Sequence, residues 1–418
     1  MTEKTLIILV GYLLIQGFEY WLKYINLRHM KIYGMNVPHG FEDYIDESVL
    51  NKTNAYTIEH NRLSLIESLF GNVLLLVFIF GGLLNAYNSW VVSLKLPFVP
   101  AGLIFFLLLG YASSLLSLPF GIYSTFKIEN KYGFNTMTVK LWISDLIKST
   151  LISTVLMSLI LSVSLWIIGS SPEYWWLFVW GFFFVFSLFM MFISPYVIEP
   201  LFNKFTPLEG DVLEGKIRGL MEKAGIKVSR VFKIDASKRS HHTNAYFTGI
   251  GKVKRIVLFD TLLSKMTEPE ILAVLSHEVG HWKKKHILKR ILFVELISFA
   301  GAYAAFRLLE TDYLARLFQI RDITLFSEIV VLGFLFSIIS FPFVPLSSYF
   351  SRKHEYEADR FASDLTSDPE SLATSLIKLS KDNLSNLHPH PLYAKFYYSH
   401  PPVVERVDKL RAEATGQL

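Results

Sequence analysis

The sequence of 418 residues contains no cysteine, and this absence excludes disulfide bonds, a thiolate metal site and a cysteine nucleophile. Charged residues are also scarce, at 18% of the chain compared with roughly 25% in soluble domains. No internal repeat and no low-complexity tract interrupts the sequence. These absences argue against a disulfide-linked scaffold, a repeat protein and an ordinary soluble enzyme.

Hydrophobic residues are abundant: they make up 52% of the chain and include 35 phenylalanines. Such a composition is typical of a protein that resides in lipid. Apolar windows of about 20 residues, the length that crosses the hydrocarbon core of a bilayer, occur near 5–25, 64–86, 98–124, 143–169, 173–197, 287–309 and 325–350. The sequence therefore predicts a mainly α, polytopic membrane protein with about seven transmembrane helices.

The distribution of lysine and arginine predicts which side of the membrane each loop faces. The N-terminus and the loops around 87–97, 170–172 and 310–324 lie on one side and contain few basic residues, whereas the segment 200–290 on the other side is rich in them. Because positively charged loops prefer the cytoplasm, the second side is predicted to be cytoplasmic. We therefore interpret the net charge of +5 as a topology signal and expect no nucleic-acid partner.

This arrangement divides the chain into four segments. Residues 1–197 contain the first five predicted spans with their cytoplasmic loops, and residues 287–350 contain spans six and seven. The hydrophilic segments 198–286 and 351–418 both fall on the cytoplasmic side, where they can form the two halves of one domain. A β-branched and apolar stretch at 253–259 predicts a small β element, as a plain structural strand or as one that pairs with an extended substrate.

A helix with a distinct polar pattern is predicted at the end of the first half, where the sequence reads SKMTEPEILAVLSHEVGHWKKKH. Thr267 and Glu270 have the spacing of a capping box that starts a helix. His281 follows His277 by four positions, so a helix presents both imidazoles on one face, with Glu278 beside them. Two neutral imidazoles suit Zn²⁺, and the carboxylate can take a proton from water whose pKa the ion lowers to about 7. This is the chemistry of peptide hydrolysis.

A catalytic zinc ion needs a third protein ligand, and the stretch SRKHEYEAD, directly after the seventh predicted span, offers one. On a helix, Glu355 and Asp359 lie on one face, so Glu355 can reach the metal while Asp359 hydrogen-bonds the outer nitrogen of a zinc-bound histidine. His354 is a rival ligand without an acidic residue four positions later, and Glu357 points elsewhere. The prediction is one Zn²⁺ per chain, bound by His277, His281 and Glu355, with 198–286 and 351–418 as the two halves of a zinc-metalloprotease domain.

Six blocks of sequence occur in a characteristic order: FKIENKYGFNTMT, SPYVIEPLFNKFTPL, DASKRSHHTNAYFTG, HEVGH, SRKHEYEAD and SHPPVVERV. By these blocks the chain resembles the type I CAAX prenyl proteases, which are integral-membrane zinc endopeptidases of the gluzincin type. The resemblance implies that Asn244 and His400 contact the substrate or the developing oxyanion and that Arg406 supports the site. It also implies a C-terminally prenylated protein substrate and a large water-filled chamber enclosed by the spans.

The residues alone leave other roles open. Asn244 can close a turn, His400 can be an ordinary loop histidine, and Arg406 can form an ion pair on a final helix. Other histidines receive no predicted role: His241, His242, His286, His388 and His390. Polar residues within the spans are compatible with a wet interior or with interhelical hydrogen bonds, and they are Glu19, Glu67, Asn72, Asn85, Glu295 and Glu328.

The leading prediction is therefore a zinc-dependent membrane endopeptidase that acts on a peptide or protein substrate at the cytoplasmic surface of the bilayer. One alternative is a bacterial quality-control metalloprotease of the membrane. Another is a non-enzymatic channel or lipid-handling protein with a structural zinc ion. The lack of cysteine, of long insertions and of a retrieval signal in EATGQL favours a bacterial inner membrane over an endoplasmic reticulum.

Overall fold

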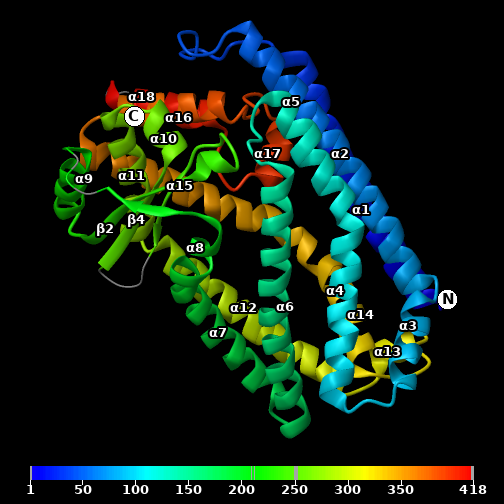
Figure 1. Ribbon diagram of the computed structural model, residues 1–418. Helices are drawn as coiled ribbons and strands as arrows, with labels where there is room; N and C mark the ends of the chain where they lie inside the picture. The colour runs from blue at the N-terminus through cyan, green and yellow to red at the C-terminus, as the bar shows by residue number, and fades with distance from the viewer. Residues whose placement is uncertain (1, 209, 211, 249–252, 416–418) are drawn as a thin grey trace.

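The computed structural model describes residues 2–208, 210, 212–248 and 253–415. Within them, seven helices are long and apolar enough to cross a membrane, which confirms the predicted number of spans. They contain α1 (Glu3–Tyr33), α2 (Glu47–Phe80), α4 (Phe98–Tyr123), α6 (Val139–Ser170), α7 (Trp175–Val197), α12 (His286–Leu309) and α14 (Leu325–Ser340). The fold is mainly helical, as the sequence predicts (Figure 1).

Several of these helices extend beyond the apolar windows. The side chains of Asp46, Thr138 and Thr324 accept hydrogen bonds from backbone N–H groups in the first turns of α2, α6 and α14. α2 therefore begins at Glu47 and not near 64, because a capping residue, and not the edge of the apolar run, determines where the helix starts. Several helices are therefore longer than the apolar windows that predict them.

A four-stranded sheet forms the small β element. Its strands are β1 (Phe205–Pro207), β2 (Lys227–Ile234), β3 (Ala245–Thr248) and β4 (Val253–Phe259), in the order β1-β2-β4-β3. β2 and β4 are parallel, whereas β1 and β3 pair antiparallel with their neighbours. Because β4 has a partner on each edge, it offers no free edge to a substrate. Of the two roles expected for 253–259, the structural one is therefore correct, and the outer strand beside it is β3.

The two hydrophilic halves pack into one body. α11 (Glu268–Lys283) lies alongside α15 (Val344–Thr366), and a buried cluster contains Leu275 of α11 together with Leu365 of α15. A second cluster joins Ala273 of α11 to Phe41, which lies between α1 and α2. The remaining elements of this part are α8 (Glu199–Phe202), α9 (Val212–Lys223), η2 (Ala236–Lys238), α10 (Asp260–Lys265), α16 (Pro369–Asp382), α17 (Pro391–Tyr397) and α18 (Val403–Ala414).

The seventh span differs from its predicted window at the end that meets the sheet domain. The window ends at 350, but α14 continues through a 3₁₀ turn, η3 (Phe341–Phe343), directly into α15, which ends at Thr366. Pro342 and Pro345 lie in the first turns of η3 and α15, where a missing N–H is tolerated. The membrane helix therefore runs into the second half without a loop.

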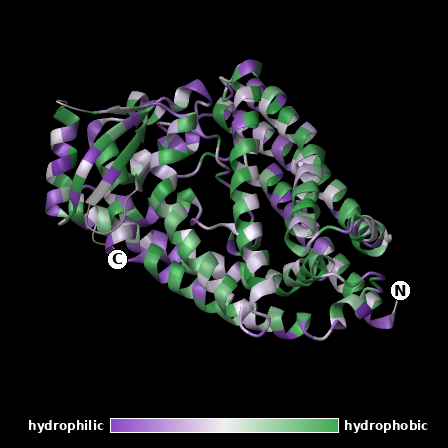
Figure 2. Cartoon of the chain, turned by 60° about the horizontal axis from the view of Figure 1, so that its bottom comes forward, coloured by the Kyte–Doolittle hydropathy of each residue, from purple (hydrophilic) through white to green (hydrophobic). Residues whose placement is uncertain are grey.

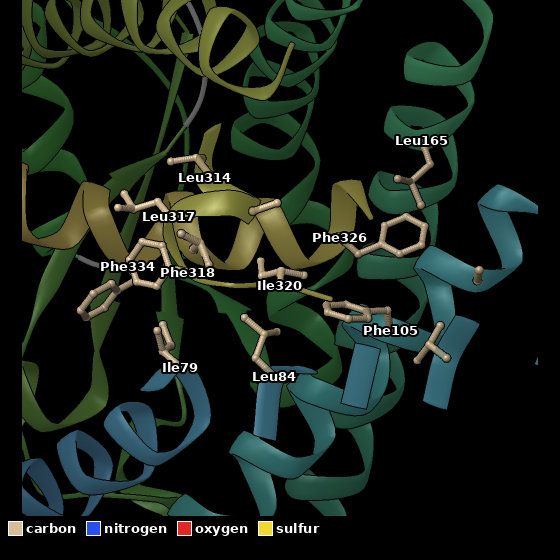
Figure 3. Packing of buried hydrophobic residues seen from close by; sticks show 14 of the residues in the cluster. Ile79, Leu84, Phe105, Leu165, Leu314, Leu317, Phe318, Ile320, Phe326 and Phe334 are labelled. Carbon is tan, nitrogen blue, oxygen red and sulfur yellow. The ribbon is translucent and has the colours of Figure 1, made fainter. Parts of the chain in front are cut away.

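Two short helices lie at the opposite end of the molecule. α3 (Leu83–Ser93) and α13 (Tyr313–Leu317) are on the same side as the N-terminus and away from the sheet (Figure 1). A buried apolar cluster joins them to α2, α4, α6 and α14, and Figure 3 shows Leu84, Leu314, Phe318 and Phe326 among its members. The predicted loops around 87–97 and 310–324 thus share one end of the molecule, and each is partly helical.

Polar side chains inside the spans form hydrogen bonds between helices. Asn72 of α2 donates to Gln16 and to Tyr20 of α1, each at 2.6 Å, and accepts from Tyr12 at 2.8 Å. Figure 2 shows long hydrophobic stretches along the spanning helices. For Asn72, interhelical bonding is therefore sufficient to explain a polar residue within a span. The buried Glu328, by contrast, has an Oε1 atom without a hydrogen-bond partner.

Candidate metal centre

α11 begins where the sequence predicts. Thr267 and Glu270 form a reciprocal capping box, in which Glu270 accepts from the Thr267 backbone N–H at 2.8 Å. Lys378 of α16 makes a 2.7 Å ion pair with the same glutamate. The start of α11 is therefore fixed to a neighbouring helix.

A close contact between two helix backbones brings the two halves of the site together. A Cβ atom built on Gly280 would lie 2.9 Å from Cα and 3.0 Å from the carbonyl oxygen of Ala358. Only a glycine allows α11 to approach α15 this closely. His277 and His281 lie within one turn of Gly280, and Glu355 lies within one turn of Ala358. The contact therefore determines how far apart the imidazoles and the carboxylate lie.

Three candidate ligand atoms converge between these helices. The Nε2 atoms of His277 and His281 are 3.1 Å apart. Glu355 places Oε2 3.4 Å from Nε2 of His277 and Oε1 3.2 Å from Nε2 of His281. For ligands about 2.0–2.1 Å from a tetrahedral zinc ion, neighbouring ligand atoms are about 3.3 Å apart. The three side chains are therefore spaced to hold one zinc ion.

A buried oxygen atom of Glu355 also fits a bound cation. Glu355 is only 4% exposed, and its Oε2 atom has no hydrogen-bond donor. A buried carboxylate is costly unless positive charge compensates it. Arg406 supplies part of that charge, with Nη1 3.4 Å from Oε2. Among the described residues the ligand group has three members, which leaves a coordination position open, as catalytic zinc sites require.

Asp359 holds His277 in the tautomer that can bind a metal. His277 Nδ1–H donates to Asp359 Oδ1 at 2.8 Å, which leaves Nε2 of the neutral ring unprotonated. Arg406 of α18 donates to both oxygens of Asp359, at 2.6 and 2.8 Å, and is itself buried. Of the roles open to Arg406, the structure shows an ion pair, so this residue positions Asp359.

The same contacts determine how protons compete for the site. Burial alone would lower the pKa of His277, but hydrogen bonds to Asp359 and Glu355 raise it to about 9 in the metal-free protein. At neutral pH a metal ion must therefore displace a proton from this histidine.

A second hydrogen-bonded chain holds His281, and sequence reasoning missed it. Nδ1 of His281 lies 3.1 Å from Nδ1 of His286, whose Nε2 lies 3.0 Å from Glu357 Oε2. Glu357 can only accept, so neutral His286 carries its proton on Nε2 and accepts at Nδ1 from His281, whose Nε2 stays free for a metal. Lys285, with a φ of 57°, turns the chain between α11 and α12 and brings His286 back onto His281. The five-residue spacing between His281 and His286 is visible in the sequence, but it indicates a contact only when the turn at Lys285 is known.

Two further histidines lie at or near the ligand group. His354, the rival ligand, stacks on His286 with ring centroids 4.0 Å apart and is not a member of the group. His400 reaches the site from the connection between α17 and α18, with Nε2 3.4 Å from Glu355 Oε1. Its side chain is 63% exposed. His400 therefore lies between the ligand group and solvent, where a substrate can reach it.

Glu278 and Asn244 differ in how closely they approach the metal centre. Glu278 is partly buried beside the two histidines, and burial raises its pKa above the ordinary value. Asn244 precedes β3 and is exposed, and its Oδ1 accepts from the N–H of Ala245 at 2.8 Å. Within the described part of the chain, no interaction joins Asn244 to the ligand group.

Comparison with known proteins identifies relatives along nearly the whole chain. Residues 26–204 match a family described as CAAX prenyl protease N-terminal, five membrane helices, and residues 207–414 match peptidase family M48. CAAX prenyl protease 1 of Saccharomyces cerevisiae is 35% identical, over 97% of this chain and 94% of its own length. The uncharacterized metalloprotease YhfN of Bacillus subtilis is 33% identical, over 81% of this chain and 80% of its own.

The fold is similar to that of a relative whose crystal structure is known. The structure of S. mikatae Ste24p superposes with a TM-score of 0.90 at 34% sequence identity, covering 98% of this chain and 99% of that one. The likeness therefore extends to the membrane helices and the sheet domain together.

The Gly280 contact leads to a direct test of the site's construction. In Gly280→Ala the new methyl group meets backbone atoms of Ala358, so we expect α15 to shift and Glu355 to move away from the histidines. The expected loss of stability is about 1–3 kcal/mol, and metal affinity should fall by roughly tenfold or more. Titration of the purified apoprotein with zinc measures the affinity.

Gly219→Ala in α9 is the matched control, because a Cβ atom there has no neighbour within 4 Å. It should leave metal binding unchanged and stabilise the helix slightly. A Gly280→Ala protein with unaltered metal affinity would show that the close helix contact does not determine the ligand geometry.

Proposed function

This chain belongs to the CAAX prenyl protease family within peptidase family M48, and because of that membership we propose that it removes the C-terminal residues of prenylated proteins. It is a membrane metalloendopeptidase, so the alternative of a non-enzymatic channel with a structural zinc ion is not retained. The observation that best supports the proposal is the convergence of His277, His281 and Glu355 between two helices from distant parts of the sequence.

The proposed cofactor is one Zn²⁺ per chain, held by those three residues. Two imidazole nitrogens and one carboxylate are a donor set that catalytic zinc sites use. When bound, the ion supplies Lewis acidity, which lowers the pKa of water and polarises the scissile carbonyl group. The open side of the ligand group, next to the exposed ring of His400, is where we place the substrate.

Four other side chains have proposed roles in the reaction. Glu278 takes the proton from the attacking water and delivers it to the leaving amine, and its raised pKa suits both transfers. His400 donates to the developing oxyanion, for which its position beside Glu355 is suitable. Asn244, at the start of the outer strand β3, binds the substrate backbone. Arg406 acts through Asp359 and so positions His277.

The proposed location of the site is the cytoplasmic membrane surface. The metal-binding helix α11 leads within a few residues into the spanning helix α12, and α15 is continuous with the spanning helix α14. The exposed side chains of Lys283, Lys284 and Lys285 lie at this junction, where basic residues favour the cytoplasmic side. A prenyl group would hold a substrate at the same surface. We keep the bacterial inner membrane as the favoured compartment.

The role of Glu278 is tested by Glu278→Gln, which keeps the size of the side chain but removes the base. We expect bound zinc to remain at one per chain while peptide hydrolysis falls by roughly 10²–10⁴-fold. Glu268→Gln, the same change in the exposed first turn of α11, is the control and should keep full activity. Activity of Glu278→Gln close to that of the unaltered protein would refute the assignment of the base.

The substrate class is tested with two reporter peptides that each contain a cysteine near the C-terminus. The peptides differ only in whether this cysteine carries a prenyl group. We expect the purified protein in detergent to cleave the lipidated reporter faster and a zinc chelator to stop cleavage of both. Equal rates on the two reporters would contradict the prenyl preference and support the quality-control alternative. The assignment of the chain as a peptidase would still hold. Cleavage that persists in the chelator would contradict the zinc assignment.

A further inference from the structure

A cationic pocket lies on the face of the sheet that is turned away from the catalytic helix. It has a volume of about 630 Å³ and lies where α7 and α8 meet the sheet. Figure 1 shows α8 next to β2 and β4, at the end of α7. The residues that line the pocket and carry the argument are Tyr196, Lys204, Phe205, Arg230, Phe232 and Arg255.

Arg255 of β4 is held in this pocket by aromatic rings and not by a carboxylate. Its guanidinium carbon lies 4.4, 4.9 and 5.2 Å from the ring centroids of Phe232, Tyr196 and Phe205. Nη1 donates to the carbonyl oxygen of Pro195 at 3.1 Å, but the buried Nε–H has no acceptor. A buried donor without a partner is costly, so an acceptor from outside the chain would improve this site.

Two more cations face the same space. Arg230 is the register partner of Arg255 in the parallel β2–β4 pair, so both side chains project from one face of the sheet. Lys204 lines the pocket from the connection before β1, and both Arg230 and Lys204 are exposed. Within the described part of the chain, none of the three forms an ion pair with a carboxylate.

Two carboxylates close to this part of the sheet have hydrogen-bond partners other than the three cations. Glu199 of α8 accepts from the hydroxyl of Tyr246 at 2.6 Å, and Asp235 accepts from the backbone N–H of Lys204 at 2.6 Å. Among the described residues, neither of these carboxylates forms an ion pair with Arg255, Arg230 or Lys204, so all three cations remain available to an anion from outside the chain. Arginine and lysine together, with N–H donors directed at one space, are the groups that bind phosphate.

The pocket also lies at the end of a candidate membrane span. Pro195 and Tyr196 belong to the last turn of α7, and the candidate span ends with α8 at Phe202, so a headgroup at the end of this span would be close to the pocket. We propose that this pocket binds a phosphate group carried by an anionic phospholipid of the adjoining leaflet, with Arg255, Arg230 and Lys204 as its ligands. Arg255 would then satisfy its free Nε–H, and the aromatic rings would pack beside the glycerol and upper acyl region.

A bound lipid at this position would brace the catalytic domain. Val231 and Leu258 on the opposite face of the same sheet belong to the cluster that also contains Leu275 of α11. The sheet therefore connects the lipid pocket on one face to the zinc-binding helix on the other. This role is independent of the substrate proposed above.

The test is native mass spectrometry of the full chain released from detergent after exchange into phosphatidylglycerol or phosphatidylcholine. We expect one phosphatidylglycerol to be retained in preference to phosphatidylcholine. Removal of one cation, in Arg230→Gln or Lys204→Gln, should reduce retention by about fivefold, and the double variant should reduce it further. The Arg255→Gln protein, if it folds, should retain no phosphatidylglycerol. The test does not depend on the folding of this variant, because Arg230 and Lys204 are exposed and can be changed without disturbing the core.

Lys233→Gln is the matched control, because Lys233 is an exposed cation of β2 whose register partner, Leu258, lies on the other face. It should retain phosphatidylglycerol as the unaltered protein does. Equal retention by the Arg230→Gln, Lys204→Gln double variant and by Lys233→Gln would overturn the site. Full displacement of the lipid by millimolar inorganic phosphate, with no preference between the two lipids, would overturn the lipid assignment in favour of free phosphate.

Discussion

The close approach of α11 to α15 at Gly280 and Ala358 is the contact on which the rest of the site depends. The two helices are far apart in the sequence, and each is attached directly to a membrane span. A side chain at position 280 would force their backbones apart. Because each helix carries ligands within one turn of the contact, a small change in their separation moves the carboxylate of Glu355 relative to both imidazoles.

Each histidine of the candidate metal site is held at its outer nitrogen by a different chain of groups. Asp359 and Arg406 hold His277, and His286 and Glu357 hold His281. In the neutral ring both chains engage Nδ1, so each selects the tautomer whose Nε2 can bind a metal, although on His277 the metal must first displace a second proton. The first chain joins α15 and α18 to the site, and the second joins the start of α12. The ligand geometry is therefore connected to the membrane helices as well as to the sheet domain.

Much of this arrangement could be predicted from local patterns. The seven spans, the capped helix with His277 and His281, and Glu355 with Asp359 all follow from hydropathy or from spacing along one helix. What could not be predicted depends on contacts between distant segments. The role of His286 depends on a left-handed turn at Lys285, the inner position of β4 depends on the order of the strands, and the pocket at Arg255 depends on where α7 meets the sheet. The continuation of the seventh span could not be predicted from hydropathy, because a helix can continue beyond the residue at which its apolar window ends.

The most direct test of the account is X-ray absorption at the zinc edge of the metal-loaded full chain, with and without the change Glu355→Ala. We expect two imidazole nitrogens and carboxylate or water oxygens at about 2.0–2.2 Å. In the variant, one protein oxygen ligand should be lost and zinc should bind more weakly. A spectrum that is unchanged by Glu355→Ala, or one without imidazole scattering, would contradict the convergence of these three residues on one ion.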